Sequence, residues 1–130
     1  MAKRSFAVIG LGRFGSAMAT TLAELGHEVI GIDGNEEKVA RLSDVVSQAV
    51  QLDATDEKAI KAAGIQDVDV AIISIGENIE SSVLVAMLVK ELGIPTIVAP
   101  LADDRIEAGD VLSLLGSTER LSELEALLKG

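Results

Sequence analysis

Three glycines near the start of the chain have the spacing of a phosphate-binding loop. They are Gly10, Gly12 and Gly15, in a G-x-G-x-x-G pattern that directly follows an apolar run. In such loops one glycine makes a tight turn, one lets the backbone approach a pyrophosphate, and one lets the next helix pack against its strand. Asp33, twenty-three residues after Gly10, ends a second apolar run. Strand, loop, helix, strand and terminal acid in this order predict a nucleotide-binding turn.

Two charged positions restrict the ligand further. Asp33 is expected to accept hydrogen bonds from both ribose hydroxyls and to repel a 2′-phosphate, which favours ATP, ADP, AMP or NAD(H) over NADP(H). Arg13 lies between the second and third glycines at an expected helix start, where a cation is unfavourable beside the helix dipole. An anion at that position would explain it, so we expect Arg13 to hold phosphate oxygens. The alternative is a solvated arginine.

The elements that must position these residues alternate along the chain. Aromatic residues make up 2% of the composition, so the core must consist of Val, Ile, Leu and Ala, as in buried parallel strands. Gly26, Gly64 and Gly93 each follow an expected helix end. The sequence predicts strands at 5–10, 28–33, 46–52, 69–75 and 96–100, and helices at 13–25, 35–43, 55–63 and 78–92.

This alternation predicts an α/β fold, a Rossmann-type doubly wound parallel sheet of order 3-2-1-4-5. Ligands of such sheets bind at the carboxyl ends of the strands, where the winding reverses. The candidate cofactor-binding residues are therefore Gly10, Leu11, Gly12, Arg13, Phe14, Gly15, Asp33, Gly34, Asp53, Ala54, Thr55, Ser74, Ile75, Gly76 and Glu77. Asp53 and Thr55 could border an adenine ring or, equally, cap the following helix.

No residue is assigned a catalytic or metal-binding role. Ser81 and Ser82 are expected in the first turn of a helix near the ligand, where serines more often cap than react. His27, at a helix-to-strand turn, is expected to be a hydrogen-bonded surface residue. The acidic residues at 103–110 lack the spacing of a calcium loop.

Composition excludes several classes of protein. The formal net charge is −10, which repels polyanions, so nucleic acid is not an expected partner. There is no cysteine, and a reducing cytoplasm is the expected location. The longest apolar run, 83–89, is far shorter than the about 20 residues of a membrane span, so no direct membrane insertion is expected.

Several motifs together resemble a known family. The segments IGLGRFG at 9–15, LGHEV at 25–29, DATD at 53–56 and DVAIISIG at 69–76 are similar to the nucleotide-binding regulators of potassium uptake, the RCK or KTN domains of the Ktr/Trk type. The resemblance runs from about residue 6 to 100. It implies a cytosolic module, not an enzyme, in which ATP and ADP, or NAD(H), favour different states of a homodimer or ring that gates a membrane-embedded potassium transporter or channel.

The resemblance also implies roles for single residues. The glycine loop with Arg13 and Phe14 would hold phosphates, Asp33 the ribose, and Asp53 and Thr55 the adenine region. The opposite wall would be formed by Ile75, Gly76 and Glu77.

The pattern departs from the family after Pro100. A family member would continue with another helix, a sixth strand and a C-terminal regulatory domain, whereas residues 101–130 resemble only the end of that domain. We expect residues 1–100 to form the Rossmann domain. Residues 101–130 are expected to add an antiparallel strand at 110–115 and a helix at 117–129, packed on the same domain or on a partner chain.

The helix expected at 78–92 is apolar around its whole circumference, because it contains the run at 83–89. A second copy of the chain is the expected cover for its outer side, and the C-terminal helix at 117–129 is the alternative.

For function, the alternative class is an NAD-dependent oxidoreductase or its nucleotide-binding subunit, which shares the fold and the glycines. Such an enzyme needs a substrate region and a proton donor, and neither is evident here.

Overall fold

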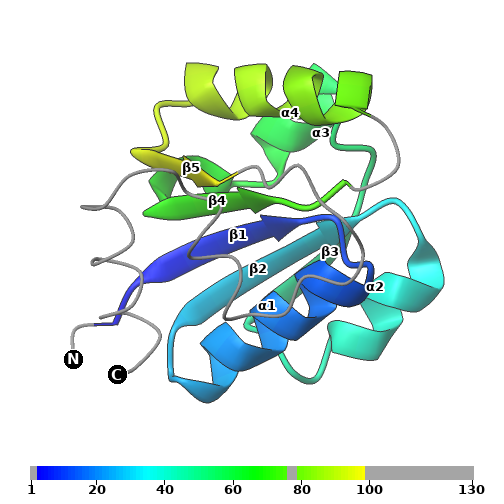
Figure 1. The fold of residues 1–130 in the computed structure, drawn as a ribbon, viewed down its shortest axis with the longest axis vertical. Helices are drawn as coiled ribbons and strands as arrows, with labels where there is room; N and C mark the ends of the chain where they lie inside the picture. Colours follow the sequence, from blue (N-terminus) through cyan, green and yellow to red (C-terminus); the bar gives the residue numbers. More distant parts are fainter. Residues whose placement is uncertain (1–2, 76–78, 99–130) are drawn as a thin grey trace.

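The structure is a computed structural model that describes residues 3–75 and 79–98. Its centre is a sheet of five parallel strands in the order β3-β2-β1-β4-β5, as the sequence predicts (Figure 1). The elements are β1 Ser5–Ile9, α1 Arg13–Glu24, β2 Glu28–Asp33, α2 Glu36–Leu42, β3 Gln48–Gln51, α3 Glu57–Ala62, the 3-10 helix η1 Ile65–Asp67, β4 Val70–Ile73, α4 Ile79–Glu91 and β5 Thr96–Val98.

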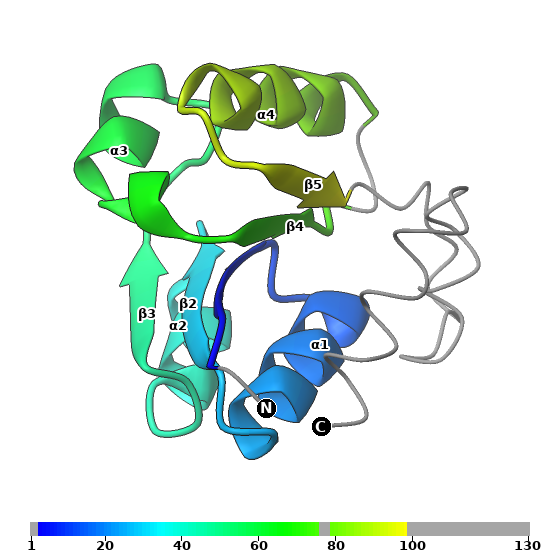
Figure 2. The same cartoon turned by 90° about the vertical axis from the view of Figure 1, so that its left-hand side faces the viewer.

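Helices cover both faces of the sheet. Figures 1 and 2 show α1 and α2 on one face and α3 and α4 on the other. Alternate side chains of β1 enter the two resulting cores, Phe6 and Val8 on the α1 side and Ala7 and Ile9 on the α4 side. Because β1 is buried on both faces, it has no polar positions after Ser5, which is typical of a central parallel strand.

The ends of the elements differ in detail from the prediction. Strands β1, β3 and β4 are shorter than expected, and the short helix η1 was not predicted. Residues 99–100 of the expected last strand lie outside the described residues. The helix-ending glycines were predicted correctly, since Gly26, Gly64 and Gly93 have φ values of 88°, 75° and 82°. The expected strand at 110–115 and helix at 117–129 lie outside the described residues.

His27 differs from its expected surface position. Its side chain is 5% exposed, and its Nδ1 accepts a hydrogen bond from the Arg4 backbone N–H at 3.1 Å. The ring also meets Phe6 edge-on, with 5.3 Å between the centroids. The histidine therefore joins the start of β1 to the start of β2, away from the carboxyl ends of the strands.

Candidate nucleotide-binding site

A cavity of about 590 Å³ opens at the carboxyl ends of the strands, on both sides of the point where the winding reverses. All four loops that follow β1, β2, β3 and β4 contribute to its wall. The lining residues are Ile9, Gly10, Gly12, Arg13, Phe14, Ile32, Asp33, Gly34, Lys38, Leu52, Asp53, Ala54, Thr55, Ser74, Ile75 and Ser81.

Gly10 and Gly15 are required by the fold itself. Gly10 has a φ of +97°, and a Cβ there would lie 2.3 Å from the Ser74 carbonyl oxygen. A Cβ on Gly15 would lie 1.8 Å from the Gly10 carbonyl oxygen. These contacts let α1 start directly against β1 and β4, which is the packing role predicted for a glycine of this loop.

Gly12 is different, because none of the described residues requires a glycine there. Its φ of −70° and ψ of −162° are open to any residue, and a Cβ there would have no atom of the described residues within 4 Å. It nevertheless lines the cavity. The missing side chain therefore leaves space for something other than the protein.

The N-terminus of α1 is uncapped, unlike those of α2 and α3. Gly12 offers no side-chain cap, and the first turn of α1 has no acidic residue. By contrast, Asn35 caps α2 and Asp56 caps α3, and both helices have glutamates in their first turns. The free N–H groups and positive dipole end of α1 therefore remain available to an anion in the cavity.

Arg13 adds a positive charge at the same end. It is the first residue of α1, it is exposed, and it lines the cavity. None of the described carboxylates forms an ion pair with it. A cation beside a positive helix end is stabilised by a bound anion, so this placement agrees with the predicted phosphate contact.

Asp33 lies at the end of β2, and each of its two carboxylate oxygens accepts a hydrogen bond from a backbone N–H. Its Oδ2 accepts from the Leu11 N–H at 2.7 Å, and its Oδ1 accepts from the Asn35 N–H at 2.8 Å. Each carboxylate oxygen has further lone-pair capacity, so the side chain can still accept from ribose hydroxyls.

Asp53 and Thr55 form a compact turn after β3. The Asp53 Oδ1 accepts from the Thr55 hydroxyl at 2.6 Å and from the Thr55 N–H at 2.9 Å, and these two bonds lower the pKa of Asp53. The side-chain cap of α3 is Asp56, whose Oδ1 accepts from the N–H groups of Lys58 and Ala59. The helix-capping alternative for Asp53 and Thr55 is therefore wrong, and both line the cavity.

The loop after β4 completes the wall. Ser74 and Ile75 line the cavity, and the Ser82 hydroxyl donates to the Ile75 carbonyl oxygen at 2.9 Å. Ser81, in the first turn of α4, also lines it. Gly76 and Glu77 lie outside the described residues.

The structure adds lining residues that the sequence analysis did not single out. Lys38, half-buried in the first turn of α2, brings a second positive charge to the cavity. The signal available in the sequence was its position five residues after Asp33, in the first turn of the helix that follows. Ile9, Ile32 and Leu52 provide apolar wall, and nothing in their local sequence separates them from other buried residues. Leu11 and Gly15, which were also predicted to bind the cofactor, are not among the residues that line the cavity.

Comparison with known proteins shows the family of this chain. The TrkA-N domain family matches residues 6–122. The chain belongs to the TrkA-N domain family. The resemblance to Ktr/Trk-type proteins inferred from the glycine and DATD motifs is thereby confirmed.

Curated relatives of this TrkA-N chain have potassium uptake names. It is 44% identical over 115 residues to Ktr system potassium uptake protein C of Bacillus subtilis, covering 88% of the chain and 51% of the relative. It is 45% identical over 94 residues to Ktr system potassium uptake protein A of the same organism, covering 72% and 42%. The chain therefore spans about half the length, or less, of the curated relatives that it matches.

Solved structures confirm the fold of the TrkA-N chain. The TrkA-N domain of inner membrane protein ybaL from Escherichia coli matches with a TM-score of 0.62 at 18% identity, covering 98% of the chain and 96% of that structure. An NAD(P)-binding domain of an exopolyphosphatase-related protein from Archaeoglobus fulgidus matches with a TM-score of 0.67 at 18% identity, covering 98% and 100%. Within the described residues, no helix combines the length and apolarity needed to cross a membrane.

Proposed function

We propose that this TrkA-N chain is a regulatory module that binds an adenine nucleotide and controls a membrane-embedded potassium transporter or channel. ATP and ADP are the favoured ligands, and NAD(H) and AMP are the alternatives. The observation that carries the proposal is the uncapped start of α1, which opens on the cavity beside Arg13 and the free space at Gly12. The names of the relatives supply the connection to potassium uptake.

In this proposal the nucleotide lies across the carboxyl ends of the strands. Its phosphates meet the first N–H groups of α1 and the Arg13 guanidinium. Its ribose hydroxyls donate to Asp33, and its adenine lies between the loops after β2 and β3, against Leu52 and Ala54. Asp53 and Thr55 border the ring, and Ser74 and Ile75 form the opposite wall.

A binding module fits the cavity better than an oxidoreductase does. Its described lining contains no histidine or cysteine, and His27 is buried at the opposite ends of the strands. The charged residues that do line it, Arg13, Lys38, Asp33 and Asp53, suit recognition of phosphates and a ribose. We therefore propose that the nucleotide is bound as a signal and not consumed in hydride transfer.

The phosphate role of Arg13 gives the direct test. We expect Arg13→Ala to weaken ATP binding about ten- to a hundredfold, the range expected for lost hydrogen bonds to a charged group. AMP should lose less, because it lacks the outer phosphates. Calorimetric titration with ATP, ADP, AMP and NADH measures all four affinities.

Arg41→Ala is the matched control for that titration. Arg41 is exposed on α2 and does not line the cavity, so this variant removes the same charge without touching the site. Equal ATP affinities of the Arg13 and Arg41 variants would show that Arg13 acts only through overall charge. If none of the four ligands bound to the wild-type chain, the proposed function itself would be wrong.

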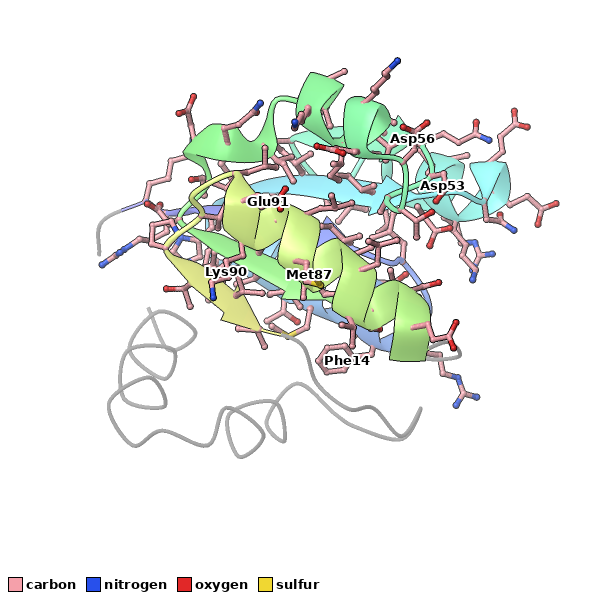
Figure 3. The ribbon with its side chains drawn as sticks, turned by 90° about the horizontal axis from the view of Figure 1, so that it is seen from above. Phe14, Asp53, Asp56, Met87, Lys90 and Glu91 are labelled. Atoms are coloured by element: carbon pink, nitrogen blue, oxygen red, sulfur yellow. The ribbon has the colours of Figure 1, made fainter. Side chains whose placement is uncertain are left out.

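We further propose that a second copy of the chain covers the outer face of α4. Val83, Leu84 and Met87 are 53%, 42% and 58% exposed on this helix, and Met87 lies on the surface of α4 that faces the viewer in Figure 3. The first turn of the same helix touches the cavity through Ser81 and is tied to Ile75 through Ser82. A ligand that moves the loop after β4 would therefore also move the face of α4 that lies between the two copies.

Changing Met87 to glutamate should break such a pair. A carboxylate buried in an apolar interface without a partner is strongly unfavourable, so we expect a dimeric wild type and a monomeric Met87→Glu variant in sedimentation velocity. Ala40→Glu, which adds the same charge at an exposed position of α2, should remain dimeric. A monomeric wild type at high protein concentration would contradict the proposal.

A further inference from the structure

The glycine loop is tied to the end of β2 by two successive N–H groups. The Gly10 N–H donates to the Ile32 carbonyl oxygen at 2.7 Å, and the Leu11 N–H donates to the Asp33 Oδ2, also at 2.7 Å. The first bond is ordinary backbone pairing. The second depends on a side chain, and that side chain is the residue from which a ribose contact is expected.

Both ends of the Asp33 carboxylate are held without any ligand. Its other oxygen, Oδ1, accepts from the Asn35 N–H at 2.8 Å, and the Asn35 side chain in turn accepts from the Lys38 N–H at 3.1 Å. The carboxylate is thus fixed between the glycine loop and the start of α2. Its orientation does not need a ribose.

The side chain of Leu11 also holds this residue in place. It is 2% exposed in the core, and both of its methyl carbons lie 3.4 Å from the position that a Cβ on Gly31 would occupy. With its side chain packed under β2 and its N–H on Asp33, Leu11 has little freedom. The next residues, Gly12 and Arg13, are therefore directed into the cavity.

We infer that Asp33 is a positioning residue for the phosphate end of the site, and not only a ribose acceptor. It holds the Leu11 N–H so that the start of α1 faces the phosphates. This inference rests on the proposed nucleotide-binding function. It also means that the Leu11 N–H is committed to the protein, so the phosphate contacts come from the N–H groups that follow it.

The charge of Asp33 and its positioning role predict opposite changes in nucleotide affinity when that charge is removed. A carboxylate near an anionic ligand repels it, so Coulomb's law alone predicts tighter phosphate binding for Asp33→Asn. Asparagine keeps the shape of the side chain but offers one accepting oxygen in place of two. We expect that oxygen to stay on the Asn35 N–H, two residues on, in the local turn that Asn side chains favour, so the Leu11 N–H loses its acceptor. If positioning dominates, binding weakens despite the lost repulsion.

The test separates the ribose contact from the positioning role. ATP and 2′,3′-dideoxy-ATP, which lacks both ribose hydroxyls, are titrated into the wild-type chain and into Asp33→Asn. We expect the variant to bind the dideoxy nucleotide about ten- to a hundredfold more weakly than the wild type does, because a charge-assisted hydrogen bond is lost. Glu36→Gln, which removes one negative charge from the exposed first turn of α2 outside the cavity lining, should bind the dideoxy nucleotide no more weakly than the wild type does.

Hydrogen exchange of the Leu11 amide provides a second measurement that needs no nucleotide. We expect this amide to be protected in the ligand-free wild-type chain and to lose protection in Asp33→Asn. Unchanged or tighter dideoxy-ATP binding by the variant would overturn the inference, as would an unprotected Leu11 amide in the wild type. Either result leaves the proposed function standing, whereas a wild-type chain that does not bind ATP would remove the function first.

Discussion

Replacing Gly12 by alanine is expected to remove most nucleotide binding while leaving the fold intact. In the part of the chain that the structure describes, a Cβ at this position meets no atom within 4 Å, and the backbone angles suit any residue. Alanine is a poorer helix N-cap than glycine but restricts the unfolded chain more, and these effects offset each other to within about 1 kcal/mol. The added methyl would occupy the space that we assign to the phosphates.

The expected loss of ATP affinity is about a hundredfold, since a displaced phosphate loses several hydrogen bonds to N–H groups. Calorimetric titration and thermal unfolding of the same preparation check the two halves of this prediction. A variant with wild-type Tm and wild-type ATP affinity would show that phosphates do not approach Gly12. The phosphate end of the proposed site would then have to be abandoned.

The same substitution three residues later should have the opposite outcome. Gly15→Ala places a Cβ 1.8 Å from the Gly10 carbonyl oxygen, which is backbone and cannot rotate away. Alanine should favour the helix by about 1 kcal/mol over glycine, so any loss of stability must come from this contact. We expect α1 to be pushed from β1, at a cost of about 3 kcal/mol or more.

Thermal unfolding measures this loss, which corresponds to a fall in Tm of more than about 10 °C for a chain of this size. Gly12→Ala is the matched control, because it is the same chemical change in the same loop. A Gly15→Ala variant as stable as the wild type would mean that α1 does not start this close to Gly10. Together the two variants distinguish a glycine needed for folding from one needed for binding.

Much of the site could be predicted because its signals are local. Gly10 and Asp33 each end an apolar run, and Thr55 follows the strand expected at 46–52. In a parallel sheet all such strand ends meet at one edge. Lys38 was missed because it belongs to the following helix. Its approach to the cavity depends on where α2 begins, which the cap at Asn35 determines.

The assignment of caps shows where local signals fail. Asp53, Thr55 and Asp56 are all able to cap a helix, and the sequence does not rank them. In the structure Asp53 accepts from Thr55, and only Asp56 reaches the first N–H groups of α3. The residue at which α3 starts thus decides which of the two acids caps the helix and which lines the cavity.

By itself the sequence determined the alternation of strands and helices, the parallel sheet order, the positions of the helix-ending glycines and the edge of the sheet at which the cavity lies. Periodicity, glycine placement and chain connectivity are properties of neighbouring residues, so they can be read without coordinates. Only the tertiary structure decided that His27 is buried, that Gly12 is the one loop glycine with free space around it, and that Asp33 holds the Leu11 N–H. Each of these depends on contacts between segments far apart in the chain, and such contacts exist only once the sheet and its helices have packed together.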